Sequence, residues 1–197
     1  SLGFNNIVVD KDTVLFADLI HFEMDPAIHS PVILGHGATT AYLENPGDFP
    51  CEEMILNARR ELDKRHELVI YEGTGHPGVG SVADVSNASV AKMLDAGVVL
   101  VVEGGIGSTI DMLNMSMALF REQDVPIIGV IINKVIPEKL GKVKKYISLW
   151  LEKQNLPLLG VIPYDPTLGY PLIRSINKAV DGTIIYNASF DNNKVEE

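Results

Sequence analysis

Residues 97–103 read Gly-Val-Val-Leu-Val-Val-Glu, and residues 104–109 continue Gly-Gly-Ile-Gly-Ser-Thr. The first stretch is apolar and mostly β-branched, which is typical of a strand buried on both faces. The residues that follow the glycines keep a helical pattern to about Gln123, so the whole segment predicts a strand, a turn and a helix. Such a unit favours an α/β fold.

The same alternation of strand and helix patterns extends along the chain. Further strands are predicted at 67–72, 126–133 and 158–163, with a shorter edge strand at 183–186. Helices are predicted at about 10–22, 51–65, 86–95, 109–123, 138–154 and 172–179. This order predicts a single domain with a doubly wound, mostly parallel sheet and helices on both faces.

Residues 25–50 are the exception to this regularity. They contain four prolines and three glycines and show no clear helical pattern. A segment so rich in helix breakers indicates an irregular surface excursion, with at most a short strand at 32–34.

Charge and composition exclude several classes of protein. The 197 residues include 16 Lys and Arg against 26 Asp and Glu, a net charge of −10, which argues against binding to the phosphate backbone of nucleic acid. No apolar run approaches the roughly 20 residues of a membrane-spanning helix, so we expect no membrane partner. The single cysteine, Cys51, excludes an intrachain disulfide, and we interpret it as structural in a cytoplasmic protein.

The carboxyl ends of the predicted strands carry the candidate site, because open parallel sheets bind ligands there. Glu72 ends the strand at 67–72 and is well placed to hold Mg²⁺, directly or through water. The glycine-rich stretch 73–80 follows, and glycines let backbone N–H groups approach an anion closely. The alternative is a flexible loop beside a solvated glutamate. We favour a functional role, because a carboxylate at the end of an apolar strand seldom serves packing.

The other strand ends give weaker signals. The turn 104–107 leads into a helix N-terminus, which is a potential anion site, although helix capping by Ser108 or Thr109 is an equal alternative. Asn133 could pair with both edges of a purine, or it could simply form a turn. Residues 163–166 read most simply as a turn, and a ligand contact there is the less favoured alternative.

Taken together, four motifs resemble one family. Residues 71–81, 102–107, 132–135 and 160–165 are similar to motifs of the dethiobiotin synthetase-like P-loop ATPases, in the cobyrinic acid a,c-diamide synthase superfamily. The likeness covers about residues 9–171 and is closest to the branch found as the N-terminal domain of some bacterial phosphate acetyltransferases. It implies a P-loop NTPase-like fold, often dimeric, so we expect a homodimer.

The resemblance also implies a reaction and a set of site residues. Members of this family use Mg-ATP to activate a carboxylate or carbamate. By position, Glu72 would bind Mg²⁺, and Asn133 would contact adenine, with Lys134 and Pro163 also at the ATP. The residues that would face a small-molecule substrate are Gly73, Thr74, Gly75, His76, Gly105 and Gly107, the last two facing either the substrate or a dimer partner.

One departure from the family bears directly on function. The sequence contains neither the Gly-x-x-x-x-Gly-Lys-Ser/Thr loop that cradles phosphates nor a Lys-Pro pair after a second strand. We therefore expect that roughly 30 to 40 N-terminal residues with the P-loop are missing from this chain. Three hypotheses follow: an ATP-dependent ligase or ATPase in complete form, a non-catalytic regulatory or scaffolding domain of the kind attached to phosphate acetyltransferase, or a substrate-binding dimer without nucleotide affinity.

Overall fold

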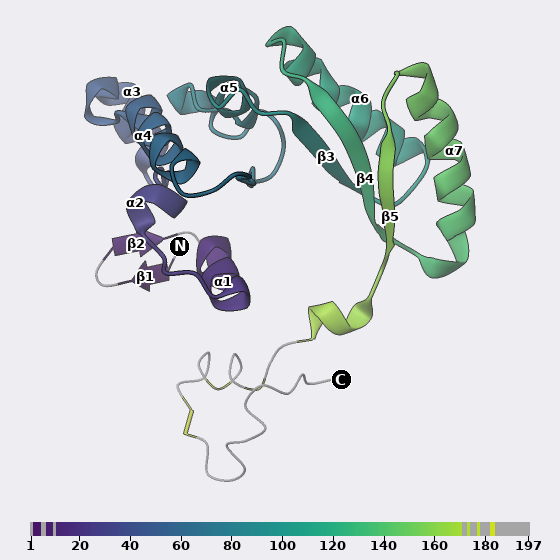
Figure 1. Cartoon of the computed structure of the whole chain (residues 1–197), viewed down its shortest axis with the longest axis horizontal. Helices are drawn as coiled ribbons and strands as arrows, with labels where there is room; N and C mark the ends of the chain where they lie inside the picture. The colour runs from purple at the N-terminus through teal and green to yellow at the C-terminus, as the bar shows by residue number, and fades with distance from the viewer. Residues whose placement is uncertain are drawn as a thin grey trace. The chain divides into compact units, whose positions relative to one another are not determined.

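A computed structural model describes residues 2–4, 7–9, 11–170, 173, 177, 182 and 183 of the chain (Figure 1). The chain divides into two compact units, Ser1–Leu100 with Asp111–Gly129 and Val101–Ile110 with Val130–Glu197. The predicted helix at 172–179 and the predicted edge strand at 183–186 lie almost entirely outside the described residues. Within the described residues, no helix is both long and apolar enough to cross a bilayer.

The first unit contains a small antiparallel sheet and several short helices. Its strands pair with Leu2 opposite Val9. Its own elements are β1 (Leu2–Phe4), β2 (Ile7–Val9), α1 (Lys11–Ile20), α2 (Pro26–His29), α3 (Ala38–Glu44), η1 (Pro46–Asp48), α4 (Cys51–Asp63), η2 (Ser81–Ala83) and α5 (Asn87–Met93).

The helix α4 carries the core of this unit on one face. Cys51, Ile55 and Ala58 recur at helical spacing and are buried, as expected of an amphipathic helix. Cys51 and Ile55 pack in one cluster with Ala83, Val85 and Leu94. Burial raises the pKa of the Cys51 thiol, so the thiol stays protonated at neutral pH, in line with its structural interpretation.

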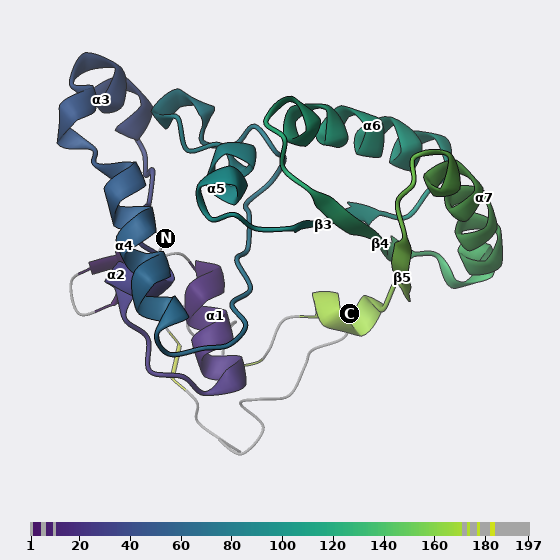
Figure 2. The same ribbon diagram turned by 45° about the horizontal axis from the view of Figure 1, so that its top comes forward.

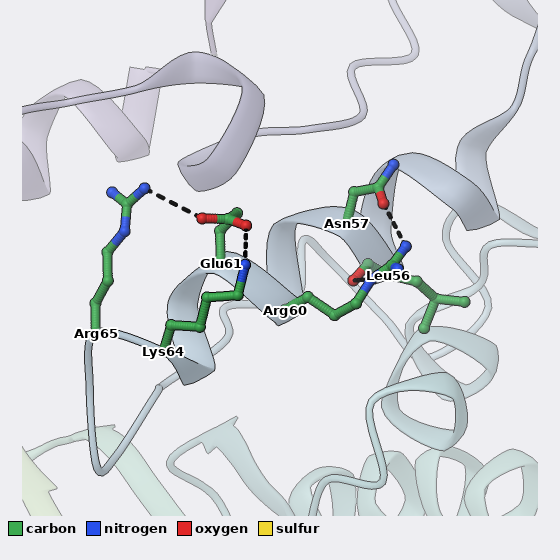
Figure 3. A network of polar contacts seen from close by, with 6 residues as sticks. All are labelled: Leu56, Asn57, Arg60, Glu61, Lys64 and Arg65. Carbon is green, nitrogen blue, oxygen red and sulfur yellow. Dashed lines mark hydrogen bonds and ion pairs between the residues drawn. The ribbon is translucent and has the colours of Figure 1, made fainter.

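Charged residues occupy the exposed surface of the same helix. Glu61 pairs with Lys64 and with Arg65, and Arg60 hydrogen-bonds Asn57 and the Leu56 carbonyl (Figure 3). The hydrogen bond and charge of Lys64 lower the pKa of Glu61. Exposed pairs of this kind contribute little to stability, so burial of the apolar face is what holds α4 in place.

The prediction for residues 25–50 is wrong, because the segment contains α2, α3 and η1 and forms no strand at 32–34. Asp25 caps α2 by accepting a hydrogen bond from the Ala27 N–H at 3.0 Å, and Pro26 occupies the first turn. Gly37, at φ +81°, precedes α3, and Pro46 begins η1. Pro26, Gly37 and Pro46 therefore stand at the starts of short helices, and proline is favoured in a first helical turn.

The sheet that defines the fold has three parallel strands in the order β3 (Val98–Glu103), β4 (Ile127–Val135) and β5 (Leu158–Pro163). Two helices, α6 (Gly107–Glu122) and α7 (Leu140–Lys153), run alongside it in both ribbon views (Figures 1 and 2). These strands and helices begin and end within two residues of the predicted positions. The prediction of an α/β fold with a parallel sheet surrounded by helices is confirmed.

Packing in the second unit follows the sequence pattern. Val143, Ile147 and Leu151 lie on one face of α7 and are buried, and α7 packs against β5. In the strands, Val130 and Ile132 of β4 are fully buried. The pairing of β4 with β5 runs from Val130 opposite Leu158 to Val135 opposite Pro163.

The strand predicted at 67–72 is not formed. Residues 66 and 68–74 are irregular, and Leu68 and Ile70 are 78% and 87% exposed. A strand needs a neighbouring backbone to complete its hydrogen bonds, and β3 pairs with β4 in the described sheet. No described segment pairs with residues 67–72, so this apolar run forms no strand.

Candidate functional site

The carboxyl ends of β3 and β4 bring two opposite charges together in the second unit. The Lys134 ammonium lies 2.9 Å from Oε1 of Glu103, and both side chains are exposed. The hydrogen bond and charge of Glu103 raise the pKa of Lys134, so the ammonium is fully charged at neutral pH. An exposed pair adds little stability, but it fixes a cation at the strand ends, where ligands bind in parallel sheets.

The backbone of β4 is irregular at this point. Lys134 has φ +53°, a left-handed conformation that is uncommon outside glycine. The register with β5 shifts between Ile132 and Val135, and Oδ1 of Asn133 accepts the Lys134 N–H at 2.8 Å. Local strain of this kind costs about 1–3 kcal/mol and recurs at functional sites.

The side chain of Asn133 therefore has a turn-forming role, as one of the two alternatives predicted. That role uses one lone pair of Oδ1, and a carbonyl oxygen has two. Its Nδ2 group donates to no acceptor within the described part of the chain. The side chain thus keeps a donor and an acceptor in a fixed orientation at the strand end, and both interpretations of Asn133 stay compatible.

The glycine turn 104–107 is packed directly onto β4. The Gly104 N–H donates to the Asn133 carbonyl at 2.7 Å, and a Cβ at Gly104 would lie 2.7 Å from Cα of Val135. Thr109 is buried and donates its hydroxyl to the Glu103 carbonyl at 2.8 Å. These contacts hold both ends of the turn, Gly104 against β4 and Thr109 against the last residue of β3.

The turn delivers the first residues of α6 to the same end of the sheet. A Cβ at Gly105 would lie 2.8 Å from Oγ of Ser108, whereas one at Gly107 would meet nothing within 4 Å. The first N–H groups of a helix have no partner within the helix and favour anions. Gly105 and Gly107 therefore adjoin a surface that suits a negatively charged group.

The end of β5 behaves mostly as the predicted turn. Pro163 is exposed, and the next residue, Tyr164, donates its N–H to the Val135 carbonyl at 2.8 Å. Asp165 accepts hydrogen bonds from the Thr167 N–H and hydroxyl, at 2.9 and 2.7 Å, and so caps η4 (Pro166–Gly169). The carboxylate of Asp165 thus has a capping role, and Pro163 presents an exposed apolar ring.

The glycine loop, residues 73–80, belongs to the first unit. Its residues Gly73, Thr74, Gly75 and His76 are exposed, as is Glu72 before them. Two conformations in the loop need glycine: Gly75 has φ +71°, and Gly80 has φ +95°. A Cβ at Gly80 would also collide with the Val85 carbonyl oxygen.

One residue that the sequence did not single out holds this loop. Nδ2 of Asn87, at the start of α5, donates to the carbonyl oxygens of Thr74 and His76, each at 2.9 Å. In the sequence, Ser86-Asn87 only indicates the start of a helix, because Ser86 is a good N-cap. Asn87 lies 13 residues from Thr74 and 11 residues from His76 in the sequence. Contacts at these separations leave no periodic pattern that could have revealed Asn87.

Glu72 is the candidate metal ligand, and its carboxylate oxygen is the type of donor that Mg²⁺ prefers. Within the described residues, no group of three His, Cys, Asp or Glu side chains is arranged to hold a metal ion. Mg²⁺ typically keeps several waters and takes one or two carboxylates together with substrate phosphates. One glutamate fits that type of site, and does not fit an all-protein metal cage.

The structure thus places the predicted residues in two groups. Asn133, Lys134, Pro163, Gly105 and Gly107 lie together at the carboxyl ends of the strands in the second unit, with Glu103 as an added member. Glu72, Gly73, Thr74, Gly75 and His76 form the glycine loop region of the first unit. Sequence reasoning missed Asn87 and the pairing of Glu103 with Lys134.

Comparison with known proteins identifies relatives of this chain. A family model described as an AAA domain matches residues 7–171. The probable cobyric acid synthase of Methanothermobacter thermautotrophicus is 32% identical over 122 residues, which are 60% of this chain and 24% of that protein. The cobyric acid synthase of Listeria monocytogenes is 34% identical over 110 residues, which are 53% of this chain and 21% of that protein.

A third relative, the cobyric acid synthase of Carboxydothermus hydrogenoformans, is 29% identical over 122 residues, which are 60% of this chain and 24% of that protein. The chain therefore spans about a quarter or less of the length of the curated relatives it matches. No solved structure matches it.

Proposed function

Since this chain belongs to the AAA domain family, a P-loop-like nucleotide-binding family with homology to cobyric acid synthases, we propose that it forms the nucleotide-binding part of a Mg-ATP-dependent ligase or ATPase. The substrate to be activated would be a carboxylate or a carbamate. The observation that carries the proposal is the cluster at the carboxyl ends of β3 and β4, where Asn133 and Lys134 interrupt the strand beside the glycine turn 104–107.

Asn133, Lys134 and Pro163 are the proposed contacts for ATP. The amide of Asn133 would hydrogen-bond the donor and acceptor edges of adenine, and the exposed ring of Pro163 would pack on an apolar surface of the nucleotide. The ammonium of Lys134 would attract a negatively charged group. The orientation of the Asn133 amide by the Lys134 N–H supports this assignment, because a fixed side chain loses little rotamer freedom on binding.

Glu72 is the proposed ligand for Mg²⁺, shared with phosphate oxygens and water. The bound Mg²⁺ would neutralise phosphate charge during phosphoryl transfer. This chain contains no Gly-x-x-x-x-Gly-Lys-Ser/Thr motif, so we propose that an N-terminal segment outside it supplies the phosphate-cradling lysine. The residues of this chain would then orient the base, hold the metal and line the substrate.

The glycine loop and the turn 104–107 are each proposed, separately, as a contact for an acidic group. Gly73, Thr74, Gly75 and His76 are exposed, and Gly105 and Gly107 adjoin the N-terminus of α6. Backbone N–H groups at both places suit a carboxylate or carbamate. We also propose that the protein acts as a homodimer, which light scattering over a concentration series would test.

The proposal is tested by isothermal titration with ADP and ATP, with and without Mg²⁺. The titration uses this chain and a version that adds any residues encoded upstream of Ser1. We expect the extended version to bind Mg-ATP, and Asn133→Ala to weaken that binding by about tenfold, because at least one hydrogen bond to the base is lost. Asn45→Ala is the matched control, since Asn45 is exposed and its side chain makes no capping bond. An extended version that binds neither nucleotide would contradict the proposal.

A second candidate is a regulatory or scaffolding domain of the type attached to phosphate acetyltransferase. A lack of the phosphate-cradling lysine in the whole protein, and not only in this chain, would favour it, because phosphoryl transfer in P-loop proteins relies on that lysine. In this case the extended version would bind ATP without hydrolysing it in the presence of any carboxylate tested. Hydrolysis stimulated by a small carboxylate would exclude this candidate.

A further inference from the structure

The glycine loop has its carbonyl groups turned toward the start of α5. The Thr74 and His76 carbonyls accept from Nδ2 of Asn87. Two further carbonyls accept from backbone N–H groups, Val79 from Asn87 at 3.2 Å and Pro77 from Ala88 at 3.2 Å. Four of the six carbonyl groups in residues 74–79 therefore accept hydrogen bonds from the first two residues of α5.

This arrangement uses up the first N–H groups of α5. The Asn87 and Ala88 N–H groups bond the loop, and the Ser89 N–H donates to Oγ of Ser86 at 3.0 Å. The donors that a helix start normally offers to a ligand are thus already paired. An anion near this loop would therefore need donors other than these, and the loop's own N–H groups are candidates.

The geometry of the peptide bond then fixes the direction of one such group. In a trans peptide the carbonyl and the following N–H point in opposite directions, and the chain contains no cis bond in its described part. Because the Thr74 carbonyl points at Asn87, the Gly75 N–H points away from α5. No described residue accepts a hydrogen bond from it. The His76 carbonyl precedes Pro77, which has no N–H.

We propose that Asn87 is a positioning residue, which holds the Thr74 carbonyl away from an incoming carboxylate and presents the Gly75 N–H to it. This inference rests on the proposed function, in which the loop binds an acidic substrate. Space for the clamp depends on Gly73, since a Cβ there would lie 3.0 Å from both Cγ and Oδ1 of Asn87. The left-handed φ of Gly75 gives the peptide the freedom to adopt this orientation.

The test is a titration of the isotope-labelled chain with sodium acetate, used as the simplest carboxylate and followed by backbone amide NMR. In the unaltered chain, we expect a saturable shift of the Gly75 amide resonance. Asn87→Ala is expected to weaken acetate binding by about tenfold, because two hydrogen bonds that orient the loop are lost. Asn87→Gln keeps both N–H donors and should recover part of the affinity, while Asn45→Ala should change nothing.

Two results would overturn the inference. One is a Gly75 resonance that does not respond to acetate in the unaltered chain. The other is an Asn87→Ala variant that melts at a lower temperature yet binds acetate with unchanged affinity while folded, as a merely structural role predicts. The ATP titration separates this test from the proposed function: a Gly75 response that Asn87→Ala weakens supports the clamp even if no nucleotide binds, and ATP binding without a Gly75 response contradicts the clamp alone.

Discussion

The two glycine-rich segments of this protein are fixed in different ways. The turn 104–107 is held by the sheet itself, through the Gly104 N–H and the close approach of Gly104 to Val135. The loop 73–80 is held mainly by the side chain of Asn87 and by the start of α5. The two segments have a similar glycine content, but backbone contacts with the sheet hold the first, whereas hydrogen bonds from a side chain and a helix start hold the second. The difference predicts how each segment responds to substitution.

The largest contrast is expected from adding one methyl group to each segment. Gly104→Ala places a Cβ against the backbone of Val135 and should lower the free energy of unfolding by about 1–3 kcal/mol, as overpacking does. Gly78→Ala is the matched change in the loop, where the nearest atom would be 3.5 Å away, and it should be nearly neutral. Urea denaturation measures both. If both substitutions lowered the free energy of unfolding equally, the turn and the loop would not differ in the way described.

A smaller effect is expected at the other side of the turn. Thr109→Val keeps the shape of the buried side chain and removes the hydroxyl that donates to the Glu103 carbonyl. The free energy of unfolding should fall by about 1 kcal/mol. Thr109→Ser, which keeps the hydroxyl, is the control. If Thr109→Val proved as stable as the original chain, packing of Gly104 alone would fix the turn.

The smallest effect concerns the exposed pair of Glu103 and Lys134. Glu103 raises the pKa of Lys134, so the folded state keeps this proton to higher pH than the unfolded chain. The stabilisation is therefore complete at neutral pH, below the ordinary pKa of lysine, and is lost as the pH rises through the raised pKa. In Glu103→Gln, less stability should be lost as the pH rises through this range, and the melting temperature at neutral pH should change only slightly.

Thermal melts of both proteins across the alkaline range, at low and high salt, measure the contribution of this pair. The control is Glu61→Gln, which removes an exposed pair on α4, far from Lys134 in the sequence. If both variants lost the same alkaline dependence, the dependence would not belong to the pair at the sheet.

The elements from β3 to β5 could be predicted from the sequence because each gives its own local signal. An apolar run of six to nine residues predicts a strand, and the glycines and helical periodicity that follow mark its end. Residues 67–72 give the same signal and form no strand, because a strand also needs a partner, which lies beyond the information in the run itself. Short helices such as α2 have too few turns to show periodicity.

The same reasoning applies to the site. The positions of Asn133 and Lys134 follow from the end of an apolar strand, so the sequence could indicate them. Their left-handed kink and the pairing of Lys134 with Glu103, 31 residues away, depend on how β3 and β4 align. Asn87 was missed for the same reason, since its partners are set by the tertiary course of the loop.

The buried Cys51 gives the first unit an internal reporter of its own opening. It is the only cysteine in the sequence, and it lies in the cluster of Ile55, Ala83, Val85 and Leu94. Cys51 is only 5% exposed, although it lines a pocket beside Tyr42 and Phe49. Separation of the cluster would therefore speed its reaction with a thiol reagent, and the reaction rate reports how often local unfolding occurs. The helix η2 follows the glycine loop directly and contributes Ala83 to the cluster. The labelling rate of the Cys51 thiol, measured with and without a ligand, would therefore show whether binding to the loop makes local unfolding of this cluster rarer.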